Sequence, residues 1–322
     1  MDPVTHAVIG AAMAKITGNT MSITDPATVA IVIGAVFPDS DILMQKWGDY
    51  AYLKNHRGAS HSIFGLAASA LLISAVLCGI YHEANIFSLF LWAFLGCFSH
   101  TFFDVFNSYG AKLLWPFTNR KFSLSLMLVF DPIFLGTLVG YVASQDNKQY
   151  IFLAAFAIHM VSRALMRLYV VIQLRNRFKD ICDRISILPS MSGLFRWSFI
   201  LENDACNIVG ERNILRRSVK IIRKLYKLEE ENLEKVLVSP VGQFFKEFTP
   251  LFHIAAEKAD GVTRYIFIDM RYYLRNNFLH HAILELDEND SIIKASFNPY
   301  SIKRSCDIKD SKLQHVGQPI NA

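Results

Sequence analysis

Long apolar runs separated by short polar loops make up most of the first half of the chain. Four of these runs approach the roughly 20 residues that a helix needs to cross the hydrocarbon core of a membrane. They lie at 62–80, 86–103, 122–143 and 150–172. The pattern therefore predicts four membrane-spanning helices joined by short loops.

Two shorter segments precede these runs. The apolar segment 27–37 lies between Pro26 and Pro38 and is too short to span a membrane alone. We expect a re-entrant or interfacial helix there, with a fifth span as the alternative. The segment 5–16 is helix-like and rich in alanine and glycine. Because small side chains let helices approach closely, the two segments are predicted to form a hairpin against the bundle.

Residues 173–322 have the mixed pattern of a soluble domain. Strand-like composition occurs at 196–201, 265–270 and 282–286, and a polar turn at 287–290 leads into a further strand at 291–297. Between 212 and 236, apolar and charged residues follow helical spacing, which predicts an amphipathic helix with a basic solvated face. The fold class is therefore mainly α: a polytopic membrane helical bundle at 1–172, followed by a soluble α+β domain at 173–322.

Composition and charge add an orientation. The chain has 322 residues, 52% of them hydrophobic, and a formal net charge of +5. Basic residues gather before the first run, between the second and third, and after the fourth, which predicts that these segments face the cytosol. We expect a multi-pass protein of the bacterial plasma (inner) membrane with cytosolic termini. Five scattered cysteines without a CxxC pair indicate reduced thiols.

The candidate functional residues lie in short polar segments, called polar islands below, that stand beside or inside the apolar runs. Ionisable groups are costly there, and imidazole and carboxylate groups are ligands of divalent metals. The candidate metal ligands are His6, Asp39, Asp41, His56, His61, His100, Asp104 and Asp131. The charge-based orientation brings these islands to one leaflet, so we expect them to converge at the cytosolic edge of the bundle. His56 and Asp131 are the weaker members of this set.

Each island has an ordinary structural alternative. His100 and Asp104 are four residues apart and share one helix face, which suits a metal or a simple buried His–Asp hydrogen bond equally well. Asp39 and Asp41 follow an apolar helix on a turn, where they either enter a site or start and cap the next segment. The island at 56–61 contains two histidines that could bind metal and Arg57, which could bind a phosphate or carboxylate. The alternative is an interfacial loop in which these side chains are exposed.

These motifs together resemble the YdjM/YfhP family of predicted membrane-bound, metal-dependent hydrolases of bacteria. The resemblance rests on the MDPVTH start, the FPDSD turn, the HRGASHS segment, the His100-x3-Asp104 pair and the 109–117 tail, and it covers about residues 1–172. Residues 173–322 resemble the extra domain of Firmicutes-type members. The His-x3-Asp helix is also similar to helices of the zinc phospholipase C and P1 nuclease group. Methionine replaces the tryptophan that starts those proteins, and the full trinuclear ligand set is not recognisable.

The resulting hypothesis is a metal-dependent hydrolase that acts on a phospholipid or another lipid-like phosphoester at the membrane. One to three divalent ions, with Zn²⁺ favoured, would activate water. Asp39 or Asp41 would accept its proton, and Arg57 would steady the developing negative charge. The alternative is a membrane-anchored regulator with a structural metal site, whose C-terminal domain binds a protein partner or DNA. Membrane lipids are the expected partners, a nucleic acid is the less favoured one, and a transporter fits four spans poorly.

Overall fold

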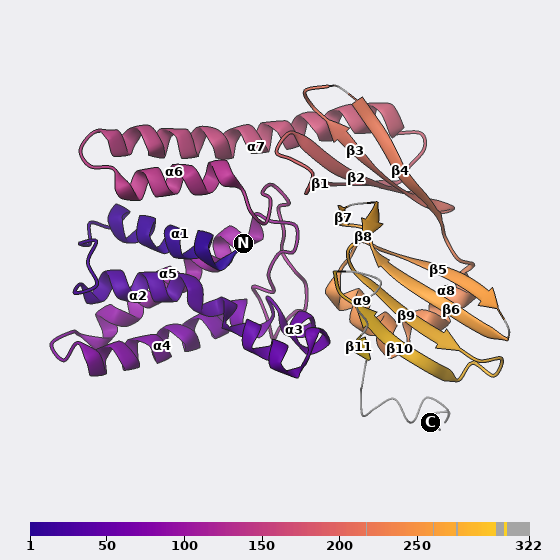
Figure 1. Ribbon diagram of the computed structural model, residues 1–322, viewed down its shortest axis with the longest axis horizontal. Coiled ribbons are helices and arrows are strands. Elements are labelled where there is room, and N and C mark those ends of the chain that lie inside the picture. Colours follow the sequence, from indigo (N-terminus) through magenta and orange to yellow (C-terminus); the bar gives the residue numbers. More distant parts are fainter. Residues whose placement is uncertain (217, 260, 275, 301–305, 308–322) are drawn as a thin grey trace.

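The fold divides into a helical half and a half made of antiparallel sheets (Figure 1). The computed structural model describes residues 1–216, 218–259, 261–274, 276–300 and, as backbone, 306–307. The helices are α1 (Pro3–Ile16), α2 (Pro26–Val36), α3 (Asp49–Asn55), α4 (Ile63–Ile80), α5 (Ile86–Val105), α6 (Pro132–Ala143) and α7 (Lys148–Phe178), with 3-10 helices η1 (Phe37–Trp47) and η2 (Ala59–His61). The predicted fold class, a helical membrane bundle followed by an α+β part, is confirmed.

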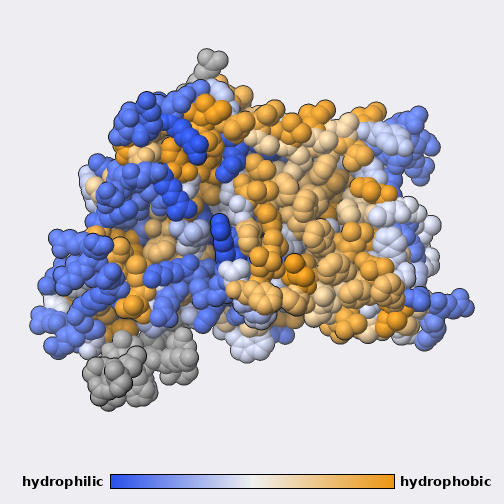
Figure 2. All heavy atoms as spheres, turned by 180° about the vertical axis from the view of Figure 1, so that it is seen from behind, coloured by the Kyte–Doolittle hydropathy of each residue, from blue (hydrophilic) through white to orange (hydrophobic). Residues whose placement is uncertain are grey.

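Among the described residues, four helical segments are long and apolar enough to cross a membrane. They are Pro26–Trp47, Ile63–Ile80, Ile86–Val105 and Lys148–Phe178. The last three confirm the predicted spans at 62–80, 86–103 and 150–172. Figure 2 shows a broad apolar band over this half of the molecule, with hydrophilic side chains gathered at both of its ends. An apolar band of this kind is the surface that hydrocarbon chains cover.

The predicted span at 122–143 is wrong, because its first part is not helical. Leu124 and Leu126 donate backbone hydrogen bonds to the carbonyls of Val105 and Phe106, which holds this stretch extended beside the end of α5. The helix begins only at Pro132, where the Asp131 carboxylate accepts hydrogen bonds from two backbone amides. Asp followed by Pro is a signal for the start of a helix, and a prediction based only on the number of consecutive apolar residues misses it.

The segment 27–37 is also longer than predicted. Pro38 does not end the helical path, because it occupies the first turn of η1, where a proline needs no amide hydrogen bond. α2 therefore continues directly into η1, and together they form a candidate span of 22 residues, which agrees with the stated alternative of a further span. The predicted hairpin of 5–16 with this helix is present: a Cβ on Gly10 of α1 would lie 2.8 Å from the Ala35 Cβ.

Glycines bring α2 and α5 into close contact. A Cβ on Gly34 would lie 2.3 Å from the Ala93 carbonyl oxygen, and one on Gly96 would lie 2.1 Å from that of Ile31. Only hydrogen side chains fit at both positions, so the two backbones touch. This contact places the end of α2 beside the last turns of α5, which carry His100 and Asp104.

The C-terminal half contains two main antiparallel sheets. The first has the order β1 (Arg184–Pro189), β2 (Arg196–Glu202), β3 (Cys206–Asn213) and β4 (Ser218–Tyr226). The second has the order β11 (Cys306–Asp307), β10 (Ile292–Asn298), β9 (His281–Leu286), β6 (Val262–Asp269) and β5 (Phe252–Ala259), with helices α8 (Glu230–Leu237) and α9 (Pro240–Phe248). A short hairpin, β7 (Tyr273–Leu274) and β8 (Asn277–Phe278), lies between β6 and β9. The four predicted strands are confirmed as β2, β6, β9 and β10.

The predicted amphipathic helix at 212–236 is wrong. The segment contains the end of β3, all of β4 and most of α8. β4 pairs with β3 along its length, for example Val219 with Arg212 and Lys220 with Glu211, so a strand ladder replaces the helix. Lys220, Arg223 and Lys224 accordingly lie on a strand instead of one helix face, and Arg217 lies outside the described residues.

Contacts across the two halves fix the soluble part against the helices. The end of α7 packs on the first sheet, where Val170 and Leu174 meet Trp197. Leu53 of α3 is buried in the core of the second sheet, which is built around Phe245, Phe267 and Phe297. The side of the bundle that carries the polar islands therefore faces the sheets. The predicted reduced state agrees with the free thiols of the four cysteines whose side chains are described.

Candidate metal centre

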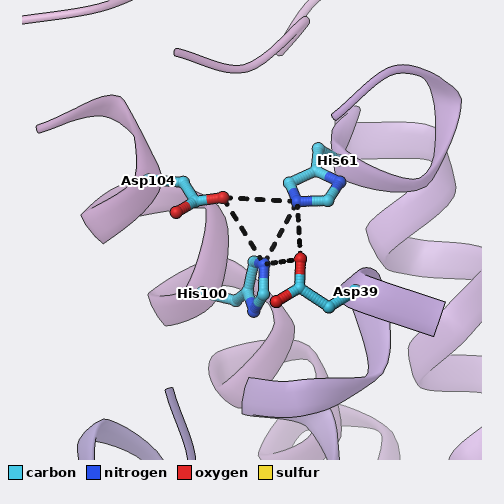
Figure 3. Close-up of side chains that lie close together, drawn as sticks. All are labelled: Asp39, His61, His100 and Asp104. Atoms are coloured by element: carbon cyan, nitrogen blue, oxygen red, sulfur yellow. Dashed lines mark hydrogen bonds and ion pairs between the residues drawn. The ribbon is translucent and has the colours of Figure 1, made fainter. Parts of the chain in front are cut away.

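Four side chains from three elements converge at the end of the bundle that faces the sheets (Figure 3). Asp39 comes from η1, His61 from η2, and His100 and Asp104 from successive turns of α5. One ligand atom from each lies within 4.8 Å of the others. His61, His100 and Asp104 are fully buried. The sequence brings these residues from three separate islands, and the structure places them in one group that could hold a metal ion.

The distances among the four groups are short. His100 Nε2 lies 3.4 Å from Asp39 Oδ1 and 3.6 Å from Asp104 Oδ2. His61 Nε2 lies 3.4 Å from the same Asp104 oxygen and 3.8 Å from Asp39 Oδ1. The two Nε2 atoms are 3.1 Å apart. All four ligand atoms therefore point at one another.

The backbone of α2 fixes the orientation and tautomer of His100. Its Nδ1 lies 2.7 Å from the Ala35 carbonyl oxygen. Because a carbonyl oxygen only accepts, Nδ1 must carry the hydrogen, and Nε2 of the neutral ring then presents a lone pair to the group. Metal-binding histidines commonly use their second nitrogen in this way. The close α2–α5 contact makes this hydrogen bond possible.

His61 has a comparable support. Its Nδ1 lies 2.9 Å from the Ser60 hydroxyl, which leaves Nε2 directed at the group. Burial lowers the pKa of His61 to about 4. The imidazole is therefore neutral at neutral pH, which is the form that binds metals.

These residues fit a divalent cation. Asp39 Oδ1 and Asp104 Oδ2 are buried and make no hydrogen bond in the described structure, although the charged Arg57 Nε lies 3.0 Å from Asp104 Oδ2. With both carboxylates ionised and His61 neutral, the four converging atoms share at most one hydrogen, on His61 Nε2. Crowded lone pairs of this kind are stabilised by a cation, and two imidazole nitrogens with two carboxylate oxygens are a common ligand set for Zn²⁺ and related metals.

A second group adjoins the first and shares Asp39. Asp39, Asp41 and His56 also each offer a ligand atom within 4.8 Å of one another. His56 Nδ1 lies 3.1 Å from Asp41 Oδ1, and the Arg57 amide donates to Asp41 Oδ2 at 3.0 Å. A carboxylate common to two groups is the arrangement expected for two neighbouring cations.

Arg57 lies beside the first group. Its Nε is 3.0 Å from Asp104 Oδ2, and its Nη1 donates to Asn107 Oδ1 at 2.7 Å. Asn107 in turn donates to the other Asp104 oxygen at 3.2 Å. Asn107 is absent from the predicted set, although its position three residues after Asp104 on the same helical path indicates such a contact. The Met1 amino group also contacts Asp104.

The remaining predicted ligands divide into one that adjoins the group and one that lies elsewhere. His6 stacks on His100 with ring centroids 3.6 Å apart, and its Nε2 lies 3.3 Å from Asp104 Oδ1. The structure does not bring Asp131 to the group. Its carboxylate caps α6 and lies 3.1 Å from His159 Nε2, so the intramembrane carboxylate that the sequence singles out has a structural partner.

A cavity of about 820 Å³ reaches the polar groups from one side. Asp39, His56 and Arg57 contribute its polar edge. The remaining walls are mostly apolar and come from both halves of the molecule, including Val36 of α2 and Leu279 of the C-terminal half. Largely apolar cavities with a few converging polar groups are typical of small-molecule sites.

Comparisons with known proteins agree with this architecture. The family model described as YdjM inner membrane protein matches residues 1–177, and the model of the YfhP C-terminal alpha/beta plait domain matches residues 231–305. The uncharacterized protein YfhP of Bacillus subtilis (strain 168) is 26% identical over 313 residues, which cover 92% of this chain and 94% of that protein. No solved structure matches the chain. The matched residues include the helical half with its apolar candidate spans and its buried Asp/His group. Because the match covers more than half of the sequence, the chain belongs to the family of YdjM inner membrane proteins.

Proposed function

We propose that this protein is a metal-dependent hydrolase of lipid-like phosphoesters, with its site at the cytosolic face of the bacterial plasma membrane. The observation that carries the proposal is the convergence of one potential ligand atom each from Asp39, His61, His100 and Asp104, which all lie within 4.8 Å of one another. Asp39 Oδ1 is buried without a hydrogen bond, whereas a group built only for structure would pair this acceptor with a donor. Zn²⁺ is the favoured ion because imidazole and carboxylate are its usual partners in catalytic sites.

The bound metal would lower the pKa of a water molecule and polarise the phosphoryl group. Asp39 or Asp41 would take the proton of the attacking water. As the new P–O bond forms, the bond to the leaving alcohol breaks, and the alcohol oxygen takes up a proton. Arg57, on the polar edge of the cavity, would steady the negative charge on the phosphoryl oxygens.

The cavity supports a lipid-like substrate. Its walls are mostly apolar while its polar edge holds Asp39 and Arg57, which suits a molecule with a hydrocarbon part and an anionic head. The bundle that carries this site belongs to a membrane-protein family, so a membrane lipid would reach it without leaving the bilayer region.

The test is hydrolysis of bis(p-nitrophenyl) phosphate by full-length protein purified in detergent. Activity is expected to disappear after dialysis against a chelator, to return with Zn²⁺, and to be lost in His61→Ala. A matched control is His82→Ala, which changes an exposed histidine in the loop between α4 and α5. A protein that holds metal stoichiometrically but hydrolyses neither phosphodiesters nor carboxylic esters would instead support the membrane-anchored regulator.

A further inference from the structure

The large cavity has walls from both halves of the molecule. Val32, Ile33 and Val36 of α2 form part of one wall, and these residues belong to the candidate span Pro26–Trp47. Met191, from the loop between β1 and β2, and Leu279, just before β9, also line the cavity. The cavity therefore lies where the membrane bundle meets the C-terminal sheets.

The apolar part of the cavity lies next to the surface that lipid covers. Ile33 lines the cavity and is also 39% exposed, and Ile42 of η1 lines it and is 51% exposed. Both residues belong to a helical segment that is long and apolar enough to cross a membrane, so hydrocarbon would lie beside their exposed parts if the segment spans the bilayer. A hydrocarbon chain in the bilayer can then enter the cavity sideways, without crossing water.

The polar end has a different chemistry. Asp39, His56 and Arg57 line the same cavity, and Asp39 also belongs to both candidate metal groups. An arginine beside a metal site recognises the oxygens of a phosphoester, whereas an apolar wall does not. One cavity thus offers a place for a hydrocarbon chain and a place for an anionic head.

The C-terminal wall is held close to this polar end. The Tyr109 ring, from the segment after α5, stacks on Tyr272 with centroids 4.6 Å apart, and the Tyr109 hydroxyl lies 3.1 Å from His280 Nε2. Arg57 lies over the same Tyr109 ring at 5.4 Å. Tyr109 therefore contacts both the arginine of the site and residues of the sheet domain on either side of Leu279 in the sequence.

We propose that this cavity binds the hydrocarbon chain of a long-chain alkyl phosphoester, and that the C-terminal domain completes the substrate site through Met191 and Leu279. The inference deepens the proposed hydrolase function and rests on it for the identity of the head group. The sheet domain would then help to select substrates by the length of their hydrocarbon chain.

The first experiment measures chain-length selectivity in full-length protein in nanodiscs of fixed lipid content. The substrates are methyl and octyl p-nitrophenyl phosphodiesters, used below the concentration at which the octyl compound forms micelles. Wild-type protein is expected to favour the octyl ester by about tenfold or more in kcat/KM, because burying several methylenes stabilises the complex. Met191→Trp and Ile42→Trp, which fill the cavity, are expected to remove most of this preference and to keep their metal.

Matched controls place the same side chain elsewhere. Leu215→Trp changes a residue that is 69% exposed in the C-terminal half, and Ile23→Trp changes one that is 84% exposed in the loop between α1 and α2. Both are expected to keep the wild-type octyl-to-methyl ratio. Because every variant is compared at the same lipid content, partition of the octyl ester into the nanodisc raises this ratio equally in all of them and cancels when the variants are compared with the wild type.

The second experiment does not depend on hydrolysis. A hexadecyl phosphate with a diazirine at the chain end is added to the nanodiscs, irradiated, and its attachment sites are mapped by mass spectrometry. Labelling of the peptides that contain Met191 or Leu279, reduced in Ile42→Trp, supports the inference. Labelling confined to exposed positions of α4 and α7, unchanged in that variant, overturns it.

The two experiments separate the inference from the proposed function. If these peptides are labelled but no phosphoester is hydrolysed, the hydrolase proposal fails and the chain site stands. If both esters are hydrolysed equally and the peptides are not labelled, the hydrolase proposal stands and the chain site is refuted.

Discussion

The Nε2 atoms of His61 and His100 lie 3.1 Å apart, although the two residues belong to different elements separated by a membrane-length helix and a loop. Each ring uses its Nδ1 in another contact, His61 with Ser60 and His100 with the Ala35 carbonyl oxygen. Both rings are therefore held by their outer nitrogens while their inner nitrogens face one point. This arrangement makes specific predictions about metal binding and stability.

The first prediction concerns the ligands themselves. Purified His100→Ala and Asp104→Ala are each expected to lose the bound metal while keeping the helical content of the wild-type protein. Elemental analysis and circular dichroism in detergent provide the measurements. His82→Ala and Asp204→Ala, at exposed positions, should keep the metal. Wild-type metal content in both ligand variants would rule out the proposed centre.

The second prediction concerns the support of His61. Ser60→Ala removes the hydroxyl that lies 2.9 Å from His61 Nδ1, so the ring loses its outer contact. Loss of such a partner typically weakens metal affinity by about 10- to 100-fold. Competition with a chromophoric chelator would measure the change, and Ser60→Thr, which retains a hydroxyl, should recover most of the affinity. An unchanged affinity in Ser60→Ala would show that the contact does not hold the ring.

The third prediction concerns the helix contact beneath the site. In Gly96→Ala, the new Cβ would lie 2.1 Å from the Ile31 carbonyl oxygen, so α2 and α5 must separate. We expect a loss of about 1–3 kcal/mol in the free energy of unfolding, as for other overpacked cores, together with weaker metal binding. Thermal unfolding in detergent would report the first effect and elemental analysis the second.

Gly79→Ala is the matched control for that substitution. A Cβ on Gly79 of α4 meets nothing within 4 Å, and alanine favours a helix over glycine by up to about 1 kcal/mol. Its stability should therefore equal or exceed that of the wild type. If both variants behaved alike, the close α2–α5 contact would not be needed for the fold.

The fourth prediction concerns pH. Burial lowers the pKa of His280 from 6.5 to about 4, so between these values the unfolded chain binds a proton that the folded protein does not. Stability should therefore fall as the pH drops from about 6.5 to 4, by about 3 kcal/mol from this residue. His280→Phe, in a pocket of aromatic rings that includes Phe248 and Phe297, should flatten the pH dependence of the unfolding midpoint. An equally steep dependence in the variant would contradict this assignment.

Local patterns in the sequence predict much of the bundle. The runs that became α4, α5 and α7 are predominantly apolar, and hydrocarbon selects for this composition wherever the helices pack. The same reasoning fails at 122–131, where the backbone pairs with the end of α5, and at 212–236, where pairing with β3 turns a helix-like pattern into a strand. Both errors have one cause, because a partner segment distant in sequence satisfies the backbone hydrogen bonds there.

Charge and hydropathy act locally along the chain, so they were enough to indicate which side chains could form a metal centre and on which side of the membrane to expect them. Tertiary structure alone decided which of them meet. It brought Asp39, His61, His100 and Asp104 together, because Gly34 and Gly96 let α2 approach α5, and it paired Asp131 with His159 elsewhere. It also placed Met191 and Leu279 on the same cavity as residues of α2, which depends on the packing of two distant halves and leaves no local pattern in the sequence.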